Sequence, residues 1–239
     1  MNEKIKKLKE IIDGTDNLVF FGGAGVSTES GIPDFRSTDG LYSQKYDFPP
    51  ETIVSHTFFM KRNKDFFDFY KDKMMALDAK PNAAHYKLAE WEAQGKCRAV
   101  VTQNIDGLHQ MAGSKNVLEL HGSIHRNYCM RCGKFFDAAY VKNSEGAPKC
   151  DECGGLIKPD VVLYEEGLDE NVISKTIHYF RQADVFIIGG TSLVVYPAAG
   201  LIDYFKGSHL ILINKSATQR DSQADLVIND KIGEVFGQL

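Results

Sequence analysis

The chain has 239 residues, of which 43% are hydrophobic, enough to bury the core of one large α/β domain or of one domain carrying a small insertion. Its 28 basic and 32 acidic residues give a net charge of −4 without a local basic patch, so direct nucleic-acid binding is not expected. No apolar run approaches the roughly 18 residues of a membrane span, and the N-terminal segment lacks the apolar core of a signal peptide. We therefore expect a cytoplasmic protein without a membrane partner.

The segment 2–12 comes first and is predicted to be an amphipathic helix, because its apolar residues recur at helical spacing. Short and nearly all-apolar runs then recur along the chain. Such runs are typical of strands that are buried on both faces of a parallel sheet. We predict strands at 18–21, 99–102, 117–120, 161–164, 185–188, 210–213 and 225–228. We predict further helices at 57–76, 82–94, 169–181, 197–206 and 231–237.

This alternation predicts an α/β fold in which a doubly wound, Rossmann-like parallel sheet forms a single catalytic domain over 1–239. The large lobe would comprise about 1–36, 81–124 and 159–239. The intervals of about 37–80 and 125–158 do not follow the strand–helix rhythm. We predict that the first is a helical insertion and that the second is a small inserted lobe.

The loop after the first predicted strand reads GGAGVSTESGIPDFR over 22–36 and resembles half of a dinucleotide-binding fingerprint. A strand, a glycine turn and a helix N-terminus together bind pyrophosphate, because free N–H groups face the anion. Gly23 and Gly25 supply the first two glycines, but Thr28 occupies the third position. No following strand ends in the acid that would hold a ribose about 20 residues later. The loop therefore predicts nucleotide binding without the complete fingerprint.

Polar residues follow several predicted strands at their carboxyl ends, where ligands gather in α/β sheets. Gln103, Asn104 and Asp106 follow one strand, and taken alone they fit a turn and helix cap as well as a ligand site. His121 follows the next strand, where an imidazole is either a satisfied structural group or a functional base. Small, hydroxyl and amide residues follow two further strands: Gly189, Gly190, Thr191, Ser192 and Asn214.

Four cysteines in the 125–158 interval form the pattern C-x2-C-x17-C-x2-C. Two such pairs can close a tetrahedral Zn–S4 site that leaves no position for water, so the predicted metal is structural and the lobe a zinc ribbon. A redox or disulfide pair is the alternative. A zinc ribbon could also bind nucleic acid, but six basic and four acidic residues leave this interval only weakly positive. The fifth cysteine, Cys97, is expected to be a packing residue.

Successive segments of the chain resemble the signature motifs of the sirtuins, which are NAD-dependent protein lysine deacylases, and particularly those of the compact bacterial members. They are GAGVSTESGIPDFR, TQNIDGLH, ELHG, the two cysteine pairs, KPDVVLYEE and GTSLVVYPAAG. The resemblance implies that NAD is a co-substrate to be cleaved, so that a hydride-transfer fingerprint is not required. It implies a deacetylase that releases nicotinamide and transfers the acetyl group of acetyl-lysine to ADP-ribose, giving O-acetyl-ADP-ribose. Acetylated proteins or peptides would be substrates, nicotinamide a product and inhibitor, and one zinc ion structural.

The resemblance also implies residue roles. His121 would be the general base and Asn104 a second catalytic residue. The NAD contacts would come from the glycine loop, the strand ends and one C-terminal position: Gly23, Ala24, Gly25, Thr28, Asp34, Phe35, Arg36, Gln103, Asn104, Ile105, Asp106, His121, Gly190, Thr191, Ser192, Asn214, Lys215 and Ile232. The substrate peptide would pair as an added strand with Val161, Val162, Leu163 and Tyr164. The zinc ligands would be Cys129, Cys132, Cys150 and Cys153.

One departure from the family pattern and two alternative functions bear on these expectations. The family commonly has glycine before glutamate after the peptide-pairing segment, whereas this chain has Glu165 and Glu166. A mono-ADP-ribosyltransferase would use the same NAD chemistry on a different acceptor. An NAD-responsive binding module without catalysis would need an impaired base or ribose site, but His121, Asn104 and Asp106 are all present.

Overall fold

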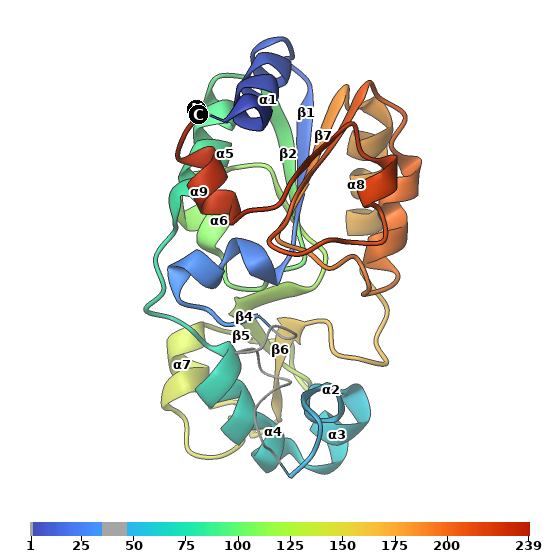
Figure 1. The fold of residues 1–239 in the computed structure, drawn as a ribbon. Coiled ribbons are helices and arrows are strands. Elements are labelled where there is room, and N and C mark those ends of the chain that lie inside the picture. The colour runs from blue at the N-terminus through green and yellow to red at the C-terminus, as the bar shows by residue number, and fades with distance from the viewer. Residues whose placement is uncertain (1, 35–46) are drawn as a thin grey trace.

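The computed structural model describes residues 2–34 and 47–239, and a six-stranded sheet forms its larger part (Figure 1). The strand order is β3-β2-β1-β7-β8-β9, and every neighbouring pair is parallel. This order confirms the predicted doubly wound fold, since two halves extend outward from the central strands β1 and β7. The strands are β1 (Leu18–Gly22), β2 (Cys97–Thr102), β3 (Val117–Glu119), β7 (Val185–Gly189), β8 (His209–Ile213) and β9 (Leu226–Ile228).

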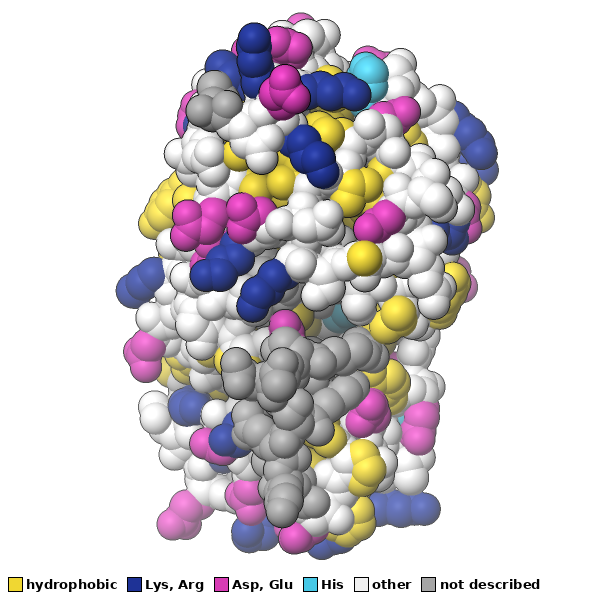
Figure 2. All heavy atoms as spheres, in the orientation of Figure 1, with side chains coloured by type: hydrophobic (Ala, Val, Ile, Leu, Met, Phe, Trp, Pro, Cys, Tyr) yellow, Lys and Arg dark blue, Asp and Glu magenta, His cyan; other side chains and the backbone are white. Residues whose placement is uncertain are grey.

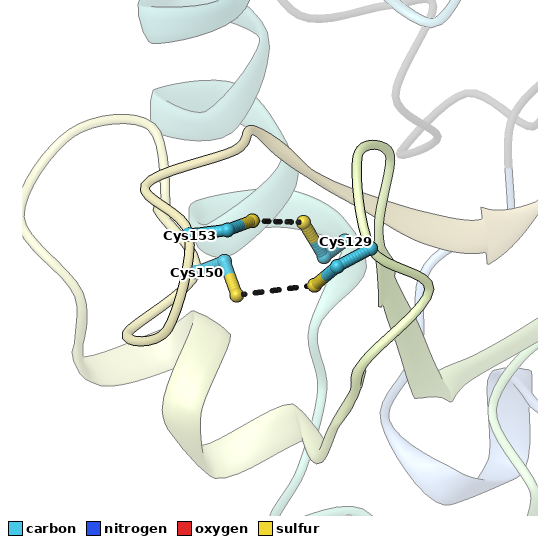
Figure 3. A group of neighbouring side chains, drawn as sticks. Cys129, Cys150 and Cys153 are labelled. Atoms are coloured by element: carbon cyan, nitrogen blue, oxygen red, sulfur yellow. Dashed lines mark hydrogen bonds between the residues drawn. The ribbon is translucent and has the colours of Figure 1, made fainter.

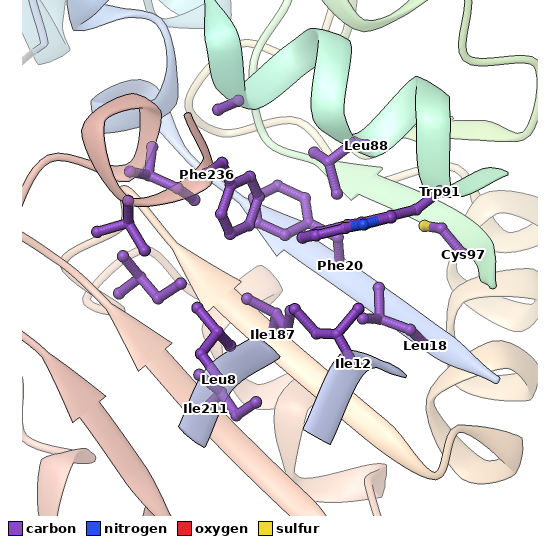
Figure 4. Packing of buried hydrophobic residues seen from close by; sticks show 14 of the residues in the cluster. Leu8, Ile12, Leu18, Phe20, Leu88, Trp91, Cys97, Ile187, Ile211 and Phe236 are labelled. Carbon is purple, nitrogen blue, oxygen red and sulfur yellow. The ribbon is translucent and has the colours of Figure 1, made fainter. Parts of the chain in front are cut away.

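Helices cover both faces of this sheet, which explains why its strands are almost continuously apolar. Alternate residues of β1 enter different cores: Leu18 and Phe20 pack in one, and Val19 and Phe21 in the other. The first core, shown in Figure 4, is closed by α1 (Glu3–Asp13), α5 (Ala83–Ala93) and α9 (Ile232–Phe236). The second is closed by α8 (Glu170–Gln182) and the 3-10 helix η5 (Ala198–Tyr204).

A smaller lobe lies below the carboxyl ends of the parallel strands in Figure 1. Its antiparallel sheet has the order β5-β4-β6 and shares one hydrophobic core with the phenylalanine-rich helices of the 47–75 region. The lobe boundaries drawn from the sequence stay predictions. The strands are β4 (Gly122–Cys129), β5 (Phe135–Phe136) and β6 (Ile157–Val161). The helices are α2 (Pro50–Ile53), α3 (His56–Lys61), α4 (Asn63–Phe69), the π-helical turn η4 (Tyr70–Met74) and α7 (Ala138–Asn143).

Four further short helices complete the described elements. They are η1 (Ala24–Val26), η2 (Thr28–Ser30), α6 (Leu108–Met111) and η6 (Asp221–Gln223). None of the helices in the described ranges is long and apolar enough to cross a membrane. On the face shown in Figure 2, acidic and basic side chains are interspersed.

Two predicted elements differ from the structure. The single helix expected over 57–76 is broken at Arg62, whose φ of −135° and ψ of 49° are not helical, so α3 and α4 are separate. The Arg62 guanidinium instead lies 4.7 Å from the ring centroid of Phe48, a cation–π contact that the helical pattern does not encode. The strand expected over 161–164 is also wrong. Only Val161 belongs to a strand, and that strand, β6, lies in the antiparallel sheet.

Candidate active site

The glycine loop after β1 packs directly on the loop after β7. The Gly25 amide donates to the Gly190 carbonyl at 2.8 Å, and the Gly23 amide donates to that of Gly189 at 3.3 Å. A Cβ atom on Gly25 would lie 2.8 Å from the Gly190 Cα, and Gly190 itself has a φ of +61°. Only glycine fits either position, because a side chain would push the two loops apart. Their contact lies where the strand order reverses, the usual ligand position in this fold.

One amide of the glycine loop remains available to a ligand. The Ala24 N–H meets no acceptor among the described residues, although its neighbours at Gly23 and Gly25 bond to the β7 loop. It belongs to a half-exposed residue at the N-terminus of the short helix η1. An amide placed there suits a phosphate oxygen, because it is a donor without a partner.

A chain of hydrogen bonds joins the glycine loop to the residues that follow β2. Ser27 Oγ donates to Asp106 Oδ2 at 2.6 Å and accepts from Asn104 Nδ2 at 3.0 Å. The other carboxylate oxygen of Asp106 accepts from the Leu108 amide at 2.9 Å. The Asn104 and Asp106 side chains are therefore held in fixed directions, and both remain half-exposed.

His121, which follows β3, is oriented by a single carbonyl. Its Nδ1 lies 2.9 Å from the Gln103 carbonyl oxygen. Because a carbonyl can only accept, Nδ1 carries the proton and Nε2 presents a lone pair. Burial lowers the pKa of His121, and the bond to the Gln103 carbonyl opposes this only in part. The imidazole is therefore neutral at pH 7 and can take up a proton at Nε2, as a general base must.

The ends of β7 and β8 form the other half of the site. Thr191 donates its amide to Asn214 Oδ1 at 2.9 Å and accepts at Oγ1 from Gln103 Nε2 at 3.1 Å. The Asn214 Nδ2 is buried and has no partner among the described residues, so this edge holds a donor that is still unsatisfied. Ser192 and Lys215 beside them are exposed, whereas Ile232 is buried against Gly189.

The four cysteines predicted to bind zinc converge in the small lobe (Figure 3). All four Sγ atoms lie within 4.8 Å of one another, with Cys129 and Cys153 3.4 Å apart and Cys132 and Cys150 3.6 Å apart. Sulfur atoms at the corners of a tetrahedral Zn–S4 site are separated by about 3.8 Å, given Zn–S bonds of about 2.3 Å. A Cβ atom on Gly155 would lie 2.7 Å from the Cys129 Sγ, so this glycine leaves room for the sulfur. The cluster fits a structural zinc ion.

Comparison with known proteins identifies the family. The sequence profile of the Sir2 family matches residues 23–197. A protein of Clostridium acetobutylicum named "NAD-dependent protein deacetylase" is 66% identical over 237 residues, covering 98% of this chain and 97% of its own. The chain belongs to the Sir2 family. A second sirtuin with the same name, from Clostridium perfringens, is 62% identical over 242 residues, covering 100% of this chain and 99% of its own.

Solved sirtuin structures share the whole fold. One described as "Structural Basis for the Mechanism and Regulation of Sir2 Enzymes" has a TM-score of 0.90 at 41% identity and covers 100% of this chain and 96% of its own. Another, "Sir2-p53 peptide-NAD+", has a TM-score of 0.87 at 38% identity and covers 100% of this chain and 97% of its own. These matches confirm the predicted bacterial-type sirtuin and its fold class.

The structure gathers most of the predicted sirtuin site residues at one edge of the sheet and adds others. Phe35 and Arg36 lie outside the described residues, while the remaining NAD-binding candidates lie on the loops after β1, β2, β3, β7 and β8 or at the start of α9. Ser27 was missed, although it is only 1% exposed and connects Asn104 to Asp106. His125 was missed as well, and its Nε2 lies 3.0 Å from the Asp106 carbonyl oxygen. Ser27 is part of the quoted glycine motif, but nothing in a sequence reveals which serine turns inward.

The segment predicted to bind the sirtuin's peptide substrate already uses much of its own main chain. Val162 donates its amide to the His121 carbonyl at 3.0 Å. Tyr164 donates to Val54 at 3.0 Å and accepts from the His56 amide at 2.9 Å, which ties the segment to the start of α3. The segment therefore bridges His121 and the helical region, rather than forming a free strand.

Proposed function

We propose that this sirtuin is an NAD-dependent protein lysine deacetylase that releases nicotinamide and forms O-acetyl-ADP-ribose. The observation that carries the proposal is His121, a neutral imidazole with Nε2 available, at the sheet edge where the glycine loops meet. The clostridial relatives carry this activity in their names. A related Sir2 structure holds deacetylated p53 peptide with 3′-O-acetyl-ADP-ribose, the kind of product that the proposal requires.

Different residues of the site would bind different parts of the NAD molecule. The free Ala24 amide suits the diphosphate, and the unsatisfied Asn214 Nδ2 suits a polar group of the adenosine half. Asn104 and Asp106, fixed through Ser27, would hold the nicotinamide ribose and carboxamide. Phe35 and Arg36 stay predictions at the nicotinamide side.

The reaction needs a base rather than a strong nucleophile. When nicotinamide leaves, positive charge develops on the ribose carbon, and the acetyl-lysine amide oxygen can attack it if held close and away from water. His121 Nε2 would then take the proton of a ribose hydroxyl, so that this oxygen can attack the acetyl carbon. Water completes the exchange, leaving free lysine and the acetyl group on ADP-ribose.

The remaining functional expectations rest on the family resemblance. The substrates would be acetylated proteins or peptides that pair beside Val162, nicotinamide would inhibit as a product, and the four-cysteine cluster would hold one structural zinc. The absence of nucleic-acid binding and the cytoplasmic location stay predictions.

A test of the function compares the wild type with His121→Ala. Purified protein is incubated with an acetyl-lysine peptide, with and without NAD, and the peptide is followed by mass spectrometry. We expect loss of the acetyl mass only when NAD is present, and none with His121→Ala, because no other group replaces the base. Circular dichroism should show that the variant is folded. Deacetylation without NAD, or a fully active His121→Ala protein, contradicts the proposal.

A further inference from the structure

Main-chain hydrogen bonds show where a substrate strand would find open partners beside His121. Leu163 donates its amide to Glu166 Oε2 at 2.9 Å, and its carbonyl accepts from the Glu166 amide at 3.0 Å. Tyr164 uses both of its main-chain groups on Val54 and His56. The groups left over are the Val162 carbonyl and both main-chain groups of Glu165, none of which has a partner in the described ranges. A peptide strand would therefore pair at Val162 and Glu165.

Glu165 has an unusual main-chain conformation for a residue with a side chain. Its φ is +76°, in the left-handed region that favours glycine. Its side chain compensates, because Glu165 Oε2 accepts from the Thr57 amide at 2.8 Å, one of the free N–H groups in the first turn of α3. The carboxylate is thus fixed beside the open edge instead of moving freely in solvent.

The charge of Glu165 is not neutralised by an ion pair, in contrast to that of its neighbour. Glu166 lies 2.8 Å from His56 Nδ1 and 3.0 Å from Lys158 Nζ. Glu165 is exposed and makes no ion pair with a cation of the described residues. The basic groups that interact with it electrostatically are His56, which Glu166 already holds, and Lys61. A fixed, exposed and unpaired carboxylate at this edge would attract a cation on a bound strand.

We propose that Glu165 is a specificity-determining residue that favours acetyl-lysine peptides with a basic residue beside the acetyl-lysine. The inference rests on the proposed deacetylase function for its substrate. It assigns two roles to one side chain: capping α3 through Thr57, and presenting negative charge to the residues that flank the acetyl-lysine.

The test uses three peptides that differ only in the residue next to the acetyl-lysine, which is Arg, Ala or Glu. We expect the wild type to prefer the Arg peptide over the Glu peptide by about fivefold in kcat/KM. This is the size expected when an exposed carboxylate attracts the Arg peptide and repels the Glu peptide. Glu165→Gln keeps an oxygen for the Thr57 amide but removes the charge, so the ratio of kcat/KM for the Arg and Glu peptides should fall below about twofold. Added salt should reduce the preference of the wild type only.

Two further variants separate charge from structure. Glu165→Gly removes both the charge and the contact with Thr57, and it should give the same ratio as Glu165→Gln whatever its stability. Glu10→Gln, on an exposed position of α1, should leave the wild-type ratio unchanged. Equal kcat/KM for the three peptides in the wild type, or an Arg preference that persists in Glu165→Gln, overturns the proposal.

Calorimetry measures the ratio of the dissociation constants of the Arg and Glu peptides, which tests the same preference without turnover. If no peptide loses its acetyl group, the deacetylase function fails while the binding ratio still tests Glu165. Binding that does not distinguish the Arg and Glu peptides would refute the role of Glu165 in that case as well. If all peptides are deacetylated at one rate, only the Glu165 inference fails.

Discussion

At the scale of single residues, the site depends on side chains that orient other side chains. Ser27 is buried and bonds to both Asn104 and Asp106, while the Gln103 carbonyl fixes the tautomer of His121. The sequence showed which residue types gather at the strand ends. It did not show that Ser27 and the Gln103 carbonyl orient these side chains, because the direction of a hydroxyl or carbonyl group depends on the backbone conformation of its loop.

The importance of Ser27 can be measured. In Ser27→Ala, Asn104 and Asp106 each lose a partner, and removing a buried hydrogen bond to a charged group costs about 1.5–3 kcal/mol. If that loss falls on NAD binding, the KM for NAD should rise at least tenfold. Steady-state kinetics with saturating peptide provide the measurement. Ser174→Ala, at an exposed position of α8, is the matched control, and an unchanged KM in Ser27→Ala would contradict the orienting role.

Two buried histidines behind the site predict how stability depends on pH. His85 and His109 are 0% and 1% exposed, and their ring centroids are 4.7 Å apart. Burial lowers the pKa of His85 to about 4 and that of His109 well below its usual value. Below about pH 6.5 the unfolded chain therefore binds protons that the folded chain does not, and stability falls as the pH is lowered.

We expect the free energy of unfolding to drop by about 1 kcal/mol per histidine between pH 6.5 and 5.5, in addition to any loss from carboxylates. Urea titrations at the two pH values measure it. His109→Leu should reduce the drop, because leucine takes up no proton when the chain unfolds. The substitution breaks no hydrogen bond, since neither ring nitrogen of His109 has a partner in the described structure. An equal drop in the wild type and in His109→Leu would show that His109 does not contribute.

At the scale of elements, the sequence predicted the parallel sheet well and the small lobe poorly. Strands such as 185–188 and 210–213 were identifiable because burial on both faces makes them continuously apolar. The segment 161–164 is equally apolar but leaves the sheet after Val161: Val162 bonds to His121, and Tyr164 bonds to Val54 and His56. The helix expected over 57–76 is interrupted at Arg62, whose guanidinium lies over the ring of Phe48. The hydrophobic periodicity of a segment does not reveal such contacts with residues elsewhere in the chain.

Removal of zinc from the four-cysteine cluster should destabilise the small lobe. The cysteine cluster lies at one end of the small antiparallel sheet, where β4 ends at Cys129, and a closed Zn–S4 site contributes folding free energy directly. Metal analysis should find about one zinc per chain. A strong chelator should lower the unfolding temperature together with the activity. Cys97→Ala should retain the zinc, because Cys97 is buried in the large-lobe core, and zinc-free fresh protein would contradict the assignment.

At the scale of the whole molecule, two lobes meet at the edge where the glycine loops, His121 and the segment 161–164 come together. Val162 bonds to the His121 carbonyl, and Tyr164 bonds to the start of α3. His121 is thus connected to the large sheet through Gln103 and to the small lobe through Val162. This arrangement places the residues of both lobes beside the imidazole of His121.

In the proposed reaction the acetyl group leaves lysine for ADP-ribose while NAD is consumed. An acetyl-lysine peptide with an isotope-labelled acetyl group is incubated with NAD, and every product is weighed by mass spectrometry. We expect unmodified lysine, nicotinamide and labelled O-acetyl-ADP-ribose in equal amounts. Labelled free acetate with intact NAD, or a peptide that has gained ADP-ribose and kept its acetyl group, would contradict it.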